Sequence, residues 1–269
     1  ASYELVSKMR ASFWVIGPLL ARCGQARVSL PGGCAIGTRP VNLYLQGLKK
    51  MGAAIDVADG YVNAKALSPS GRLAGAQINF PFVSVGATHV MMMAASLADG
   101  QTIINNAGSE PEIMDVGRCL QAMGAQIEGL GTRTLIIDGV ENLNGTTHTV
   151  IRDRIEAGAY ACAVVASNGE VTLTGADEAF LGSLALVLQQ AGATFETKPD
   201  GLLVKGTSDI RPVNVVTEPY PGFATDLQAP FMGLMCVANG VSHVRETIFE
   251  NRFMHVQELA RLGADIELQ

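Results

Sequence analysis

Several features that mark other classes of protein are missing from this sequence. No apolar run reaches the roughly 18 to 20 residues needed to cross a bilayer, because Gly17-Pro18, His89 and Pro230 interrupt the longest candidates. The first residues also lack the pattern of a signal peptide. The five cysteines have no CxxC spacing, which disfavours a disulfide framework or a zinc site. We therefore predict a protein of a reducing compartment, the cytoplasm by default, with no membrane partner.

Motifs of common enzyme classes are absent as well. The sequence contains no Walker loop, no metal-ligand spacing and no Ser/His/Asp order, so no metal or cofactor is predicted. The net charge of −6 disfavours a nucleic acid partner, since phosphate backbones bind basic surfaces. An anionic small molecule remains compatible, because local arginines can oppose the overall sign. With 48% hydrophobic residues in 269, the chain can form one large domain or two smaller ones.

What the sequence does contain is one plan repeated four times. In each repeat an apolar helical run ends at a glycine and a β-branched strand follows, and a second helix then ends at a Gly-Ala pair that opens another strand. The pairs begin at 52, 124, 192 and 263, so the period is 72, 68 and 71 residues. Glycine after a helix fits the left-handed capping position. The first glycines of the four repeats are Gly24, Gly100, Gly169 and Gly240.

This order of elements predicts an α/β fold with mixed sheets. Two repeats precede residues 150 to 153 and two follow, so we predict one domain over residues 1–151 and a second over 152–269. Residues 3 to 23 have apolar side chains at helical spacing and predict an amphipathic helix, kinked or interrupted at Pro18.

The first repeat has at least four extra residues around Cys34, within the sequence PGGCAIGTRP at 31 to 40. Long loops on a rigid scaffold are where binding and catalysis concentrate. Arg39 and upstream arginines favour the thiolate form of a nearby cysteine. An inert structural thiol is the alternative for Cys34, and it is the interpretation preferred for the other four cysteines, which lie in apolar helical runs.

Other candidate residues have ordinary structural interpretations beside functional ones. Ser84, Val85 and Gly86 precede a helix, where backbone N–H groups can meet an anion, although an ordinary N-cap is the preferred interpretation from the residues alone. Asp226 is expected as a first-turn cap, and His255 as a packed or hydrogen-bonded side chain rather than a base. Surface or inter-domain roles are expected for the remaining charged candidates, Arg10, Asp153, Arg154 and Arg252.

Seven segments, in order along nearly the whole chain, resemble the UDP-N-acetylglucosamine enolpyruvyl transferases of the enolpyruvyl transferase family. They are KMRAS at 8 to 12, LPGGCAIGTRPVNL at 30 to 43, VSVGAT at 83 to 88, EPEIMD at 110 to 115, DRIEAG at 153 to 158, TDLQA at 225 to 229 and FENRFMHVQEL at 249 to 259.

The resemblance implies two domains, each an inside-out α/β barrel of three similar units, both incomplete here. Six units would make about 420 residues, so the chain is expected to be truncated at both ends, and the full-length protein to be a monomer. The implied reaction moves enolpyruvyl from phosphoenolpyruvate to the 3-hydroxyl of UDP-N-acetylglucosamine and releases phosphate. It is the first committed step of peptidoglycan synthesis, and the family is the target of fosfomycin.

The resemblance also implies roles for single residues. Cys34 would be the general acid toward the phosphoenolpyruvate methylene and the residue that fosfomycin alkylates. Arg39 would hold phosphoenolpyruvate as a bidentate anion clamp. Asp226 would contact the sugar hydroxyl as a candidate base, and domain closure would bring it to Cys34. Substrate-binding positions would be Arg10, Arg39, Pro40, Val41, Asn42, Leu43, Val83, Ser84, Val85, Gly86, Asp226, Ile248 and Arg252.

Five positions depart from the usual family pattern. Asn42 stands where an aspartate is usual, Phe82 where a lysine is frequent and Ser109 where an arginine is frequent, while Ala157 and Ala224 replace a threonine and a proline. Two alternatives to a UDP-N-acetylglucosamine enolpyruvyl transferase remain open. One is a catalytically inactive relative that binds UDP-sugar or a protein partner, and the other is a 3-phosphoshikimate enolpyruvyl transferase.

Overall fold

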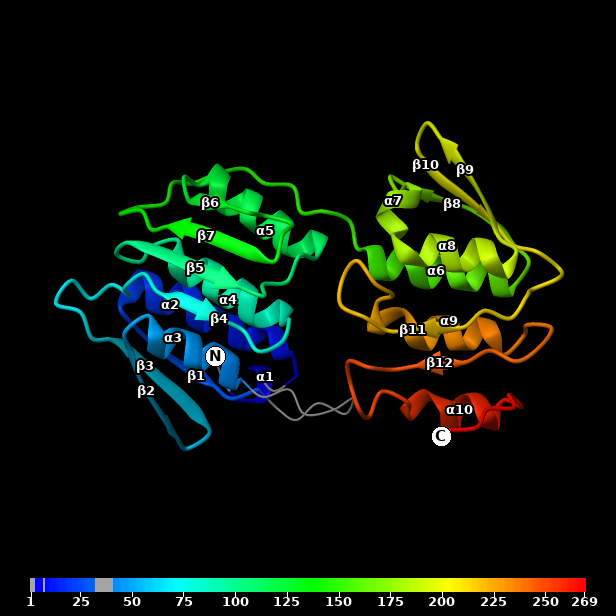
Figure 1. Cartoon of the computed structure of the whole chain (residues 1–269), viewed down its shortest axis with the longest axis horizontal. Helices are drawn as coiled ribbons and strands as arrows, with labels where there is room; N and C mark the ends of the chain where they lie inside the picture. Colours follow the sequence, from blue (N-terminus) through cyan, green and yellow to red (C-terminus); the bar gives the residue numbers. More distant parts are fainter. Residues whose placement is uncertain (1–2, 7, 32–40) are drawn as a thin grey trace. The chain divides into compact units, whose positions relative to one another are not determined.

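The four glycine-marked repeats form the framework of the computed structural model, which describes residues 3–6, 8–31 and 41–269. Unit 1 extends to Ile151 and contains repeats I and II, and unit 2 begins at Arg152 and contains repeats III and IV (Figure 1). Each unit has its own hydrophobic core. The predicted α/β class with mixed sheets is confirmed. Among the described helices, none combines the length and apolar character of a membrane span.

Repeat I folds as a helix, a strand, a second helix and a β-hairpin. The last strand of the hairpin lies in the middle of a three-stranded antiparallel sheet, in the order β1-β3-β2. Its elements are α2 (Ile16–Cys23), β1 (Gln25–Ser29), α3 (Asn42–Lys50), β2 (Ala53–Ala58) and β3 (Tyr61–Ala66).

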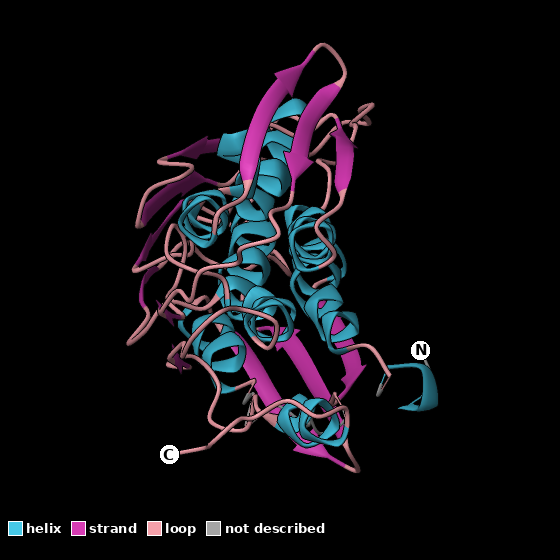
Figure 2. Ribbon diagram, turned by 90° about the vertical axis from the view of Figure 1, so that its right-hand side faces the viewer, coloured by secondary structure: helices cyan, strands magenta, loops and turns pink. Residues whose placement is uncertain are grey.

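Repeats II and III copy this arrangement, with the sheet orders β5-β7-β6 and β8-β10-β9. Two differences are local: β4 (Gln77–Asn79) adds a parallel edge strand beside β5, and the second helix of repeat III is divided into two. The β9–β10 hairpin extends beyond the helices of unit 2 in Figures 1 and 2. The elements are α4 (Val85–Ala95), β5 (Gln101–Asn105), α5 (Pro111–Ala122), β6 (Gln126–Glu128), β7 (Thr134–Asp138), α6 (Arg154–Ala166), β8 (Glu170–Thr174), α7 (Glu178–Leu181), α8 (Ser183–Ala191), β9 (Thr194–Lys198) and β10 (Gly201–Lys205).

Repeat IV is less regular. Its first strand, β12, forms a two-stranded parallel sheet with β11 from the preceding linker. The predicted strand over residues 264 to 268 is wrong, because these residues have no strand conformation. Elsewhere the strand after the Gly-Ala pair is stabilised by the next strand of a hairpin, and no described strand pairs with 264–268. The elements are β11 (Val215–Val216), η2 (Thr225–Leu227), α9 (Gln228–Met235), β12 (Val244–Arg245) and α10 (Met254–Arg261).

One backbone hydrogen bond recurs in the first three repeats. The residue after or at the end of the central strand donates its N–H to the carbonyl of the first glycine. The three bonds are Ala66 to Gly24 at 2.8 Å, Gly139 to Gly100 at 3.1 Å and Gly206 to Gly169 at 2.8 Å. In these three repeats the predicted period therefore corresponds to a unit that is closed in the same way.

The capping glycines adopt the backbone conformation that the sequence predicts. All four Gly-Ala glycines have positive φ, from 84° at Gly52 to 111° at Gly192. Three of the four first glycines do as well. Gly169 is the exception, because Asn168 occupies the left-handed conformation in its place at φ 50°. Asparagine tolerates this region better than most residues do.

The predicted helix over residues 3 to 23 is wrong in its interior. The structure has α1 (Tyr3–Val6), a 3-10 helix η1 (Arg10–Val15) and then α2. Met9 is extended, with φ −135° and ψ 108°, and separates the first two. Pro18 lies in the first turn of α2, where its missing N–H has no intrahelical acceptor to lose. The interruption thus precedes the proline.

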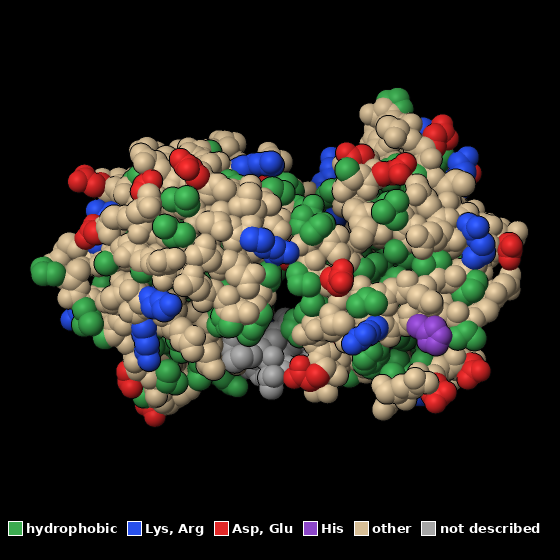
Figure 3. All heavy atoms as spheres, in the orientation of Figure 1, with side chains coloured by type: hydrophobic (Ala, Val, Ile, Leu, Met, Phe, Trp, Pro, Cys, Tyr) green, Lys and Arg blue, Asp and Glu red, His purple; other side chains and the backbone are tan. Residues whose placement is uncertain are grey.

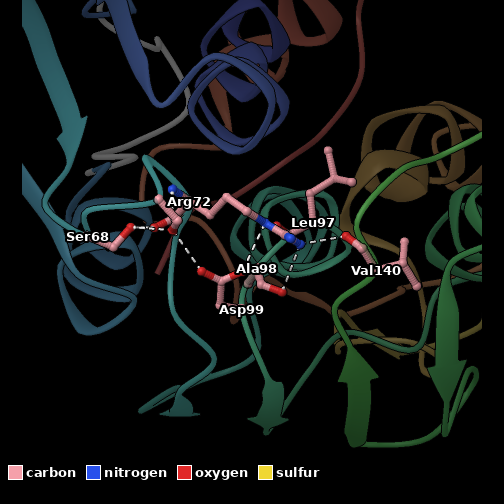
Figure 4. A network of polar contacts seen from close by, with 7 residues as sticks. Ser68, Arg72, Leu97, Ala98, Asp99 and Val140 are labelled. Carbon is pink, nitrogen blue, oxygen red and sulfur yellow. Dashed lines mark hydrogen bonds and ion pairs between the residues drawn. The ribbon is translucent and has the colours of Figure 1, made fainter.

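A side-chain clamp joins the linker after repeat I to repeat II (Figure 4). The guanidinium of Arg72 donates to the carbonyls of Leu97, Ala98 and Val140 at 3.0, 3.4 and 2.6 Å and pairs with Asp99 at 3.0 Å. At the corresponding junction in unit 2, Asn239 donates to Asp209 at 2.7 Å.

The sheets face the helices with their apolar sides. In repeat I, Val28, Val62 and Ala64 are buried, while the alternate residues Gln25 and Arg27 are exposed. Helix α4 is buried nearly all round, as expected for a helix that is apolar on every face. On the face shown in Figure 3, acidic and basic side chains are interspersed and form no single basic patch.

Candidate functional site

The predicted loop residues Cys34, Arg39 and Pro40 lie outside the described residues. The flanking elements show where that loop connects. Ser29 ends β1 and Asn42 begins α3, whereas in repeat II Asn105 ends β5 and Pro111 begins α5. The longer connection in repeat I is therefore confirmed, and the roles of Cys34, Arg39 and Pro40 stay predictions.

Helix α4 begins with the predicted cap. Ser84 has extended backbone angles, and its hydroxyl accepts the N–H of Ala87 at 3.3 Å. Thr88 in the same turn donates its hydroxyl to the Ser84 carbonyl at 2.8 Å and accepts the N–H of Gly108 at 2.9 Å. The first turn of the helix is thus tied to the segment that precedes α5.

Gly86 lets two aromatic side chains approach this first turn. A Cβ atom at Gly86 would lie 2.2 Å from the Tyr44 hydroxyl oxygen and 3.0 Å from the Trp14 ring nitrogen. Tyr44 comes from α3, and Trp14 comes from η1, which begins at Arg10. The elements that carry three predicted binding segments, η1 with Arg10, α3 with Asn42 and Leu43, and the first turn of α4, therefore contact one another through Trp14, Tyr44 and Gly86.

The exposure of these residues differs. Val41 is buried at the position before α3, Asn42 is exposed as the first residue of the helix, and Leu43 packs partly against the core. Phe82, one of the departures from the family pattern, is 58% exposed two residues before the Ser84 cap. Ser109, another departure, is buried. An exposed aromatic ring thus lies next to the helix N-terminus, at the position where the resemblance leads to the expectation of a lysine.

His89 supports this end of α4 from within and was not predicted. Its ring stacks on Trp14 with centroids 4.8 Å apart, and its Nδ1 lies 3.0 Å from the Val85 carbonyl oxygen. Burial lowers the pKa of His89 below its ordinary value. The neutral imidazole therefore acts as a fixed support for the Ser84-Gly86 turn rather than as a cation.

In unit 2, Asp226 and Arg252 form an ion pair. Nη2 of Arg252 lies 2.7 Å from Oδ1 of Asp226. Asp226 lies in the first turn of η2, as expected, but its Oδ1 accepts a hydrogen bond from Arg252 rather than from a helix N–H group. Its carboxylate is 53% exposed, which leaves it accessible to a ligand hydroxyl. Ile248, another predicted binding residue, precedes Arg252 in the same loop.

A carboxylate that the sequence analysis did not single out organises this loop. Glu246 accepts the hydroxyls of Thr217 and Thr225 at 2.9 and 2.8 Å and the N–H groups of Ile248 and Phe249 at 2.8 and 3.1 Å. The sequence gives no spacing signal for this cluster, because its donors come from three separate segments.

Three further expectations can be compared with the structure. Asp153 caps α6 by accepting two N–H groups at 2.8 and 3.0 Å, and the Arg154 guanidinium lies over the Tyr220 ring. His255 is partly buried, and burial together with the charge of Arg252 lowers its pKa. Cys162 is buried, which raises the pKa of its thiol to about 12 and agrees with the structural role expected for it. Among the described residues, no group of three His, Cys, Asp or Glu side chains is arranged to hold a metal ion.

The comparisons with known proteins agree with one another. The family model for EPSP synthase (3-phosphoshikimate 1-carboxyvinyltransferase) matches residues 1–269. Proteins named UDP-N-acetylglucosamine 1-carboxyvinyltransferase from Allorhizobium ampelinum and Agrobacterium fabrum are 62% and 61% identical over all 269 residues. The chain spans 62% of the length of these relatives.

Solved structures show the same fold at lower identity. The enolpyruvyl transferase NikO from Streptomyces tendae superposes with a TM-score of 0.84 at 23% identity, over 100% of this chain and 63% of that one. The EPSP synthase of Acinetobacter baumannii gives a TM-score of 0.59 at 19% identity, over 87% of this chain and 54% of that one. Because this family model matches every residue of the chain, the chain belongs to the EPSP synthase (3-phosphoshikimate 1-carboxyvinyltransferase) family.

Proposed function

We propose that this chain takes part in the transfer of enolpyruvyl from phosphoenolpyruvate to the 3-hydroxyl of UDP-N-acetylglucosamine, with release of phosphate. The observation that carries the proposal is the 62% identity, over every residue of the chain, to a protein named UDP-N-acetylglucosamine 1-carboxyvinyltransferase. Transfer to shikimate 3-phosphate is less favoured, because the relatives that match the whole chain are named UDP-N-acetylglucosamine 1-carboxyvinyltransferase. The reaction would serve peptidoglycan synthesis.

In this proposal the two units supply different groups. Unit 1 offers the N-terminal turn of α4, where backbone N–H groups and the helix dipole favour the diphosphate of the nucleotide sugar. Arg10, Val41 to Leu43 and Val83 to Gly86 would surround it. Cys34 would protonate the phosphoenolpyruvate methylene, and Arg39 would hold its anionic groups.

Unit 2 would supply the base. One oxygen of Asp226, Oδ1, accepts a hydrogen bond from Arg252, and the half-exposed carboxylate can receive the proton of the 3-hydroxyl through its other oxygen. Ile248 and Arg252 would contact the sugar from the same loop. Closure of the two domains, each proposed to be an inside-out barrel when complete, would bring Asp226 to Cys34 and exclude water.

The four cysteines of the described residues are free thiols, which suits a reducing compartment, and we propose the cytoplasm as the site of the reaction.

The proposal is tested by measuring phosphate release from phosphoenolpyruvate with UDP-N-acetylglucosamine as acceptor. The 269-residue chain, its Cys34→Ala variant and a form extended to match the full length of the relatives are compared. We expect release that requires UDP-N-acetylglucosamine, is lost in Cys34→Ala and is not supported by shikimate 3-phosphate. Release with shikimate 3-phosphate alone would assign the sister activity. Binding of UDP-N-acetylglucosamine without release in any form would indicate a catalytically inactive binding protein.

A further inference from the structure

Glu246 is the point where three segments of unit 2 are joined. Its Oε1 accepts from the Thr217 hydroxyl, which follows β11, and from the N–H groups of Ile248 and Phe249. Its Oε2 accepts from the Thr225 hydroxyl at the start of η2. Four donors hold this one carboxylate in place. Because charge-assisted hydrogen bonds are stronger than neutral ones, they join the three segments firmly.

Thr225 connects this carboxylate to the Asp226–Arg252 pair. Its hydroxyl has a single proton, and that proton points to Glu246, because an ionised carboxylate only accepts hydrogen bonds. The hydroxyl oxygen is therefore free to accept Nη1 of Arg252, which lies 3.2 Å away. The negative charge of Glu246 thus fixes the direction of the Thr225 hydroxyl, and that direction suits the arginine.

Arg252 is fixed at several other points. Nη2 donates to Asp226 at 2.7 Å, the backbone carbonyl accepts the side-chain amide of the fully buried Gln228 at 3.2 Å, and the guanidinium lies 5.5 Å from the Phe249 ring centroid. The arginine side chain is only 17% exposed. The rotation of the guanidinium plane is determined by two of its contacts, Nη1 with the Thr225 hydroxyl and Nη2 with Asp226.

We propose that Glu246, acting through the hydroxyl of Thr225, is a positioning residue that orients Arg252 and thereby the carboxylate of Asp226. The inference deepens the proposed function, because it names the groups that hold the candidate base in place. Neither Glu246 nor Thr225 needs to touch the substrate. A carboxylate that must receive a proton from one hydroxyl of a sugar has to be held within a fraction of an ångström, and the network supplies that restraint.

The test separates the hydroxyl from the methyl group of Thr225. Thr225→Val keeps the shape of the side chain and removes the hydroxyl, and Thr225→Ser keeps the hydroxyl. Glu246→Gln keeps the size of the carboxylate and removes its charge. Thr197→Val, at an exposed position on β9, is the matched control.

The first readout is the solvent exchange of the Arg252 guanidinium protons, followed by NMR in the 269-residue chain. We expect exchange to rise about tenfold in Thr225→Val and Glu246→Gln, the factor that corresponds to about 1.4 kcal/mol. Exchange in Thr225→Ser and in the Thr197→Val control should stay within about twofold of the unsubstituted chain. Unchanged exchange in a folded Thr225→Val variant would overturn the proposal.

The second readout is steady-state phosphate release in whichever form of the chain turns over. We expect kcat to fall about tenfold in Thr225→Val with little change in the KM for phosphoenolpyruvate, and the loss to be recovered in Thr225→Ser. A full kcat in Thr225→Val would contradict the positioning role even if phosphate release is established. If no form releases phosphate, the proposed function fails, and the exchange measurement still decides whether Glu246 and Thr225 orient Arg252.

Discussion

The guanidinium of Arg252 lies 2.7 Å from the carboxylate of Asp226, and the two partners differ in burial. The arginine side chain is 17% exposed and the aspartate 53%. The cation is thus the fixed partner, and it holds an accessible carboxylate in one orientation. In an enolpyruvyl transferase this arrangement suits a base that has to meet one hydroxyl of an incoming sugar.

Substitution Asp226→Asn should remove the proposed base while keeping an oxygen for Arg252. We expect phosphate release to slow by at least about 100-fold, the lower end of the range for a general base. UDP-N-acetylglucosamine should still bind, which calorimetry can check. Glu258→Gln, at an exposed position of α10, removes a carboxylate of the same unit and serves as control. A normal rate in Asp226→Asn would exclude the carboxylate from proton transfer.

The Arg72 clamp should contribute to the stability of unit 1. Arg72→Met leaves the carbonyls of Leu97, Ala98 and Val140 without their side-chain donor and also removes the ion pair with Asp99. We expect the free energy of unfolding to fall by about 2 kcal/mol, measured by urea denaturation. Arg118→Met replaces an exposed arginine of α5 and should change it by less than about 0.5 kcal/mol. Equal effects of the two substitutions would show that the clamp does not stabilise the junction.

Buried His89 should make the stability of the chain depend on pH. Its pKa is lowered in the folded state, so the unfolded chain binds more protons once the pH falls below about 6.5. The contribution of neutral His89 to the free energy of unfolding is therefore fully present above that pH and is lost as the pH falls toward 5. His255, whose pKa is also lowered, acts in the same direction.

We expect His89→Phe to flatten the decrease in unfolding free energy between pH 7 and 5, even though the substitution itself lowers stability at neutral pH. Denaturant titrations at several pH values provide the measurement. His243→Phe, which removes an exposed imidazole, is the comparison. A slope identical to that of the unsubstituted chain would mean that His89 is protonated in the folded state as readily as in the unfolded one.

Gly86 should resist even a methyl group. In Gly86→Ala the new Cβ meets the Tyr44 hydroxyl oxygen, and we expect a loss of about 1 to 3 kcal/mol despite the better helix propensity of alanine. The loss should be smaller by about 1 kcal/mol in a Tyr44→Phe background, where the colliding oxygen is absent. Gly145→Ala, where the added atom meets open space, should be nearly neutral. The same loss in both backgrounds would locate the collision elsewhere.

The repeat, the α/β class and the capping glycines could be predicted from the sequence, because they depend on local chemistry that recurs at a fixed period. Gly52, Gly124, Gly192 and Gly263 all adopt positive φ. Two of the errors have different causes, one local and one a missing strand pairing. Asn168 competes with Gly169 for the left-handed position, and residues 264–268 have strand composition but no described partner strand.

The support of the candidate site could not be predicted, because it depends on contacts between distant positions. Glu246 gathers donors from residues 217, 225, 248 and 249, and no spacing rule links these positions. Trp14, Tyr44 and Gly86 likewise meet only after η1, α3 and α4 have packed together. The sequence predicted Gly86 and Asp226 as site residues, but it did not predict the side chains that contact them.

The backbone bond that closes each of the first three repeats also bears on how they fold. It connects positions 24 and 66, 100 and 139, and 169 and 206, so the three loops bridge 42, 39 and 37 positions. The entropy lost on closing a loop grows with the logarithm of its length, and these closures therefore differ by only about 0.1 kcal/mol. The closure of this bond therefore gives none of the three repeats an entropic advantage in folding, and differences in their folding rates are expected to come from other contacts.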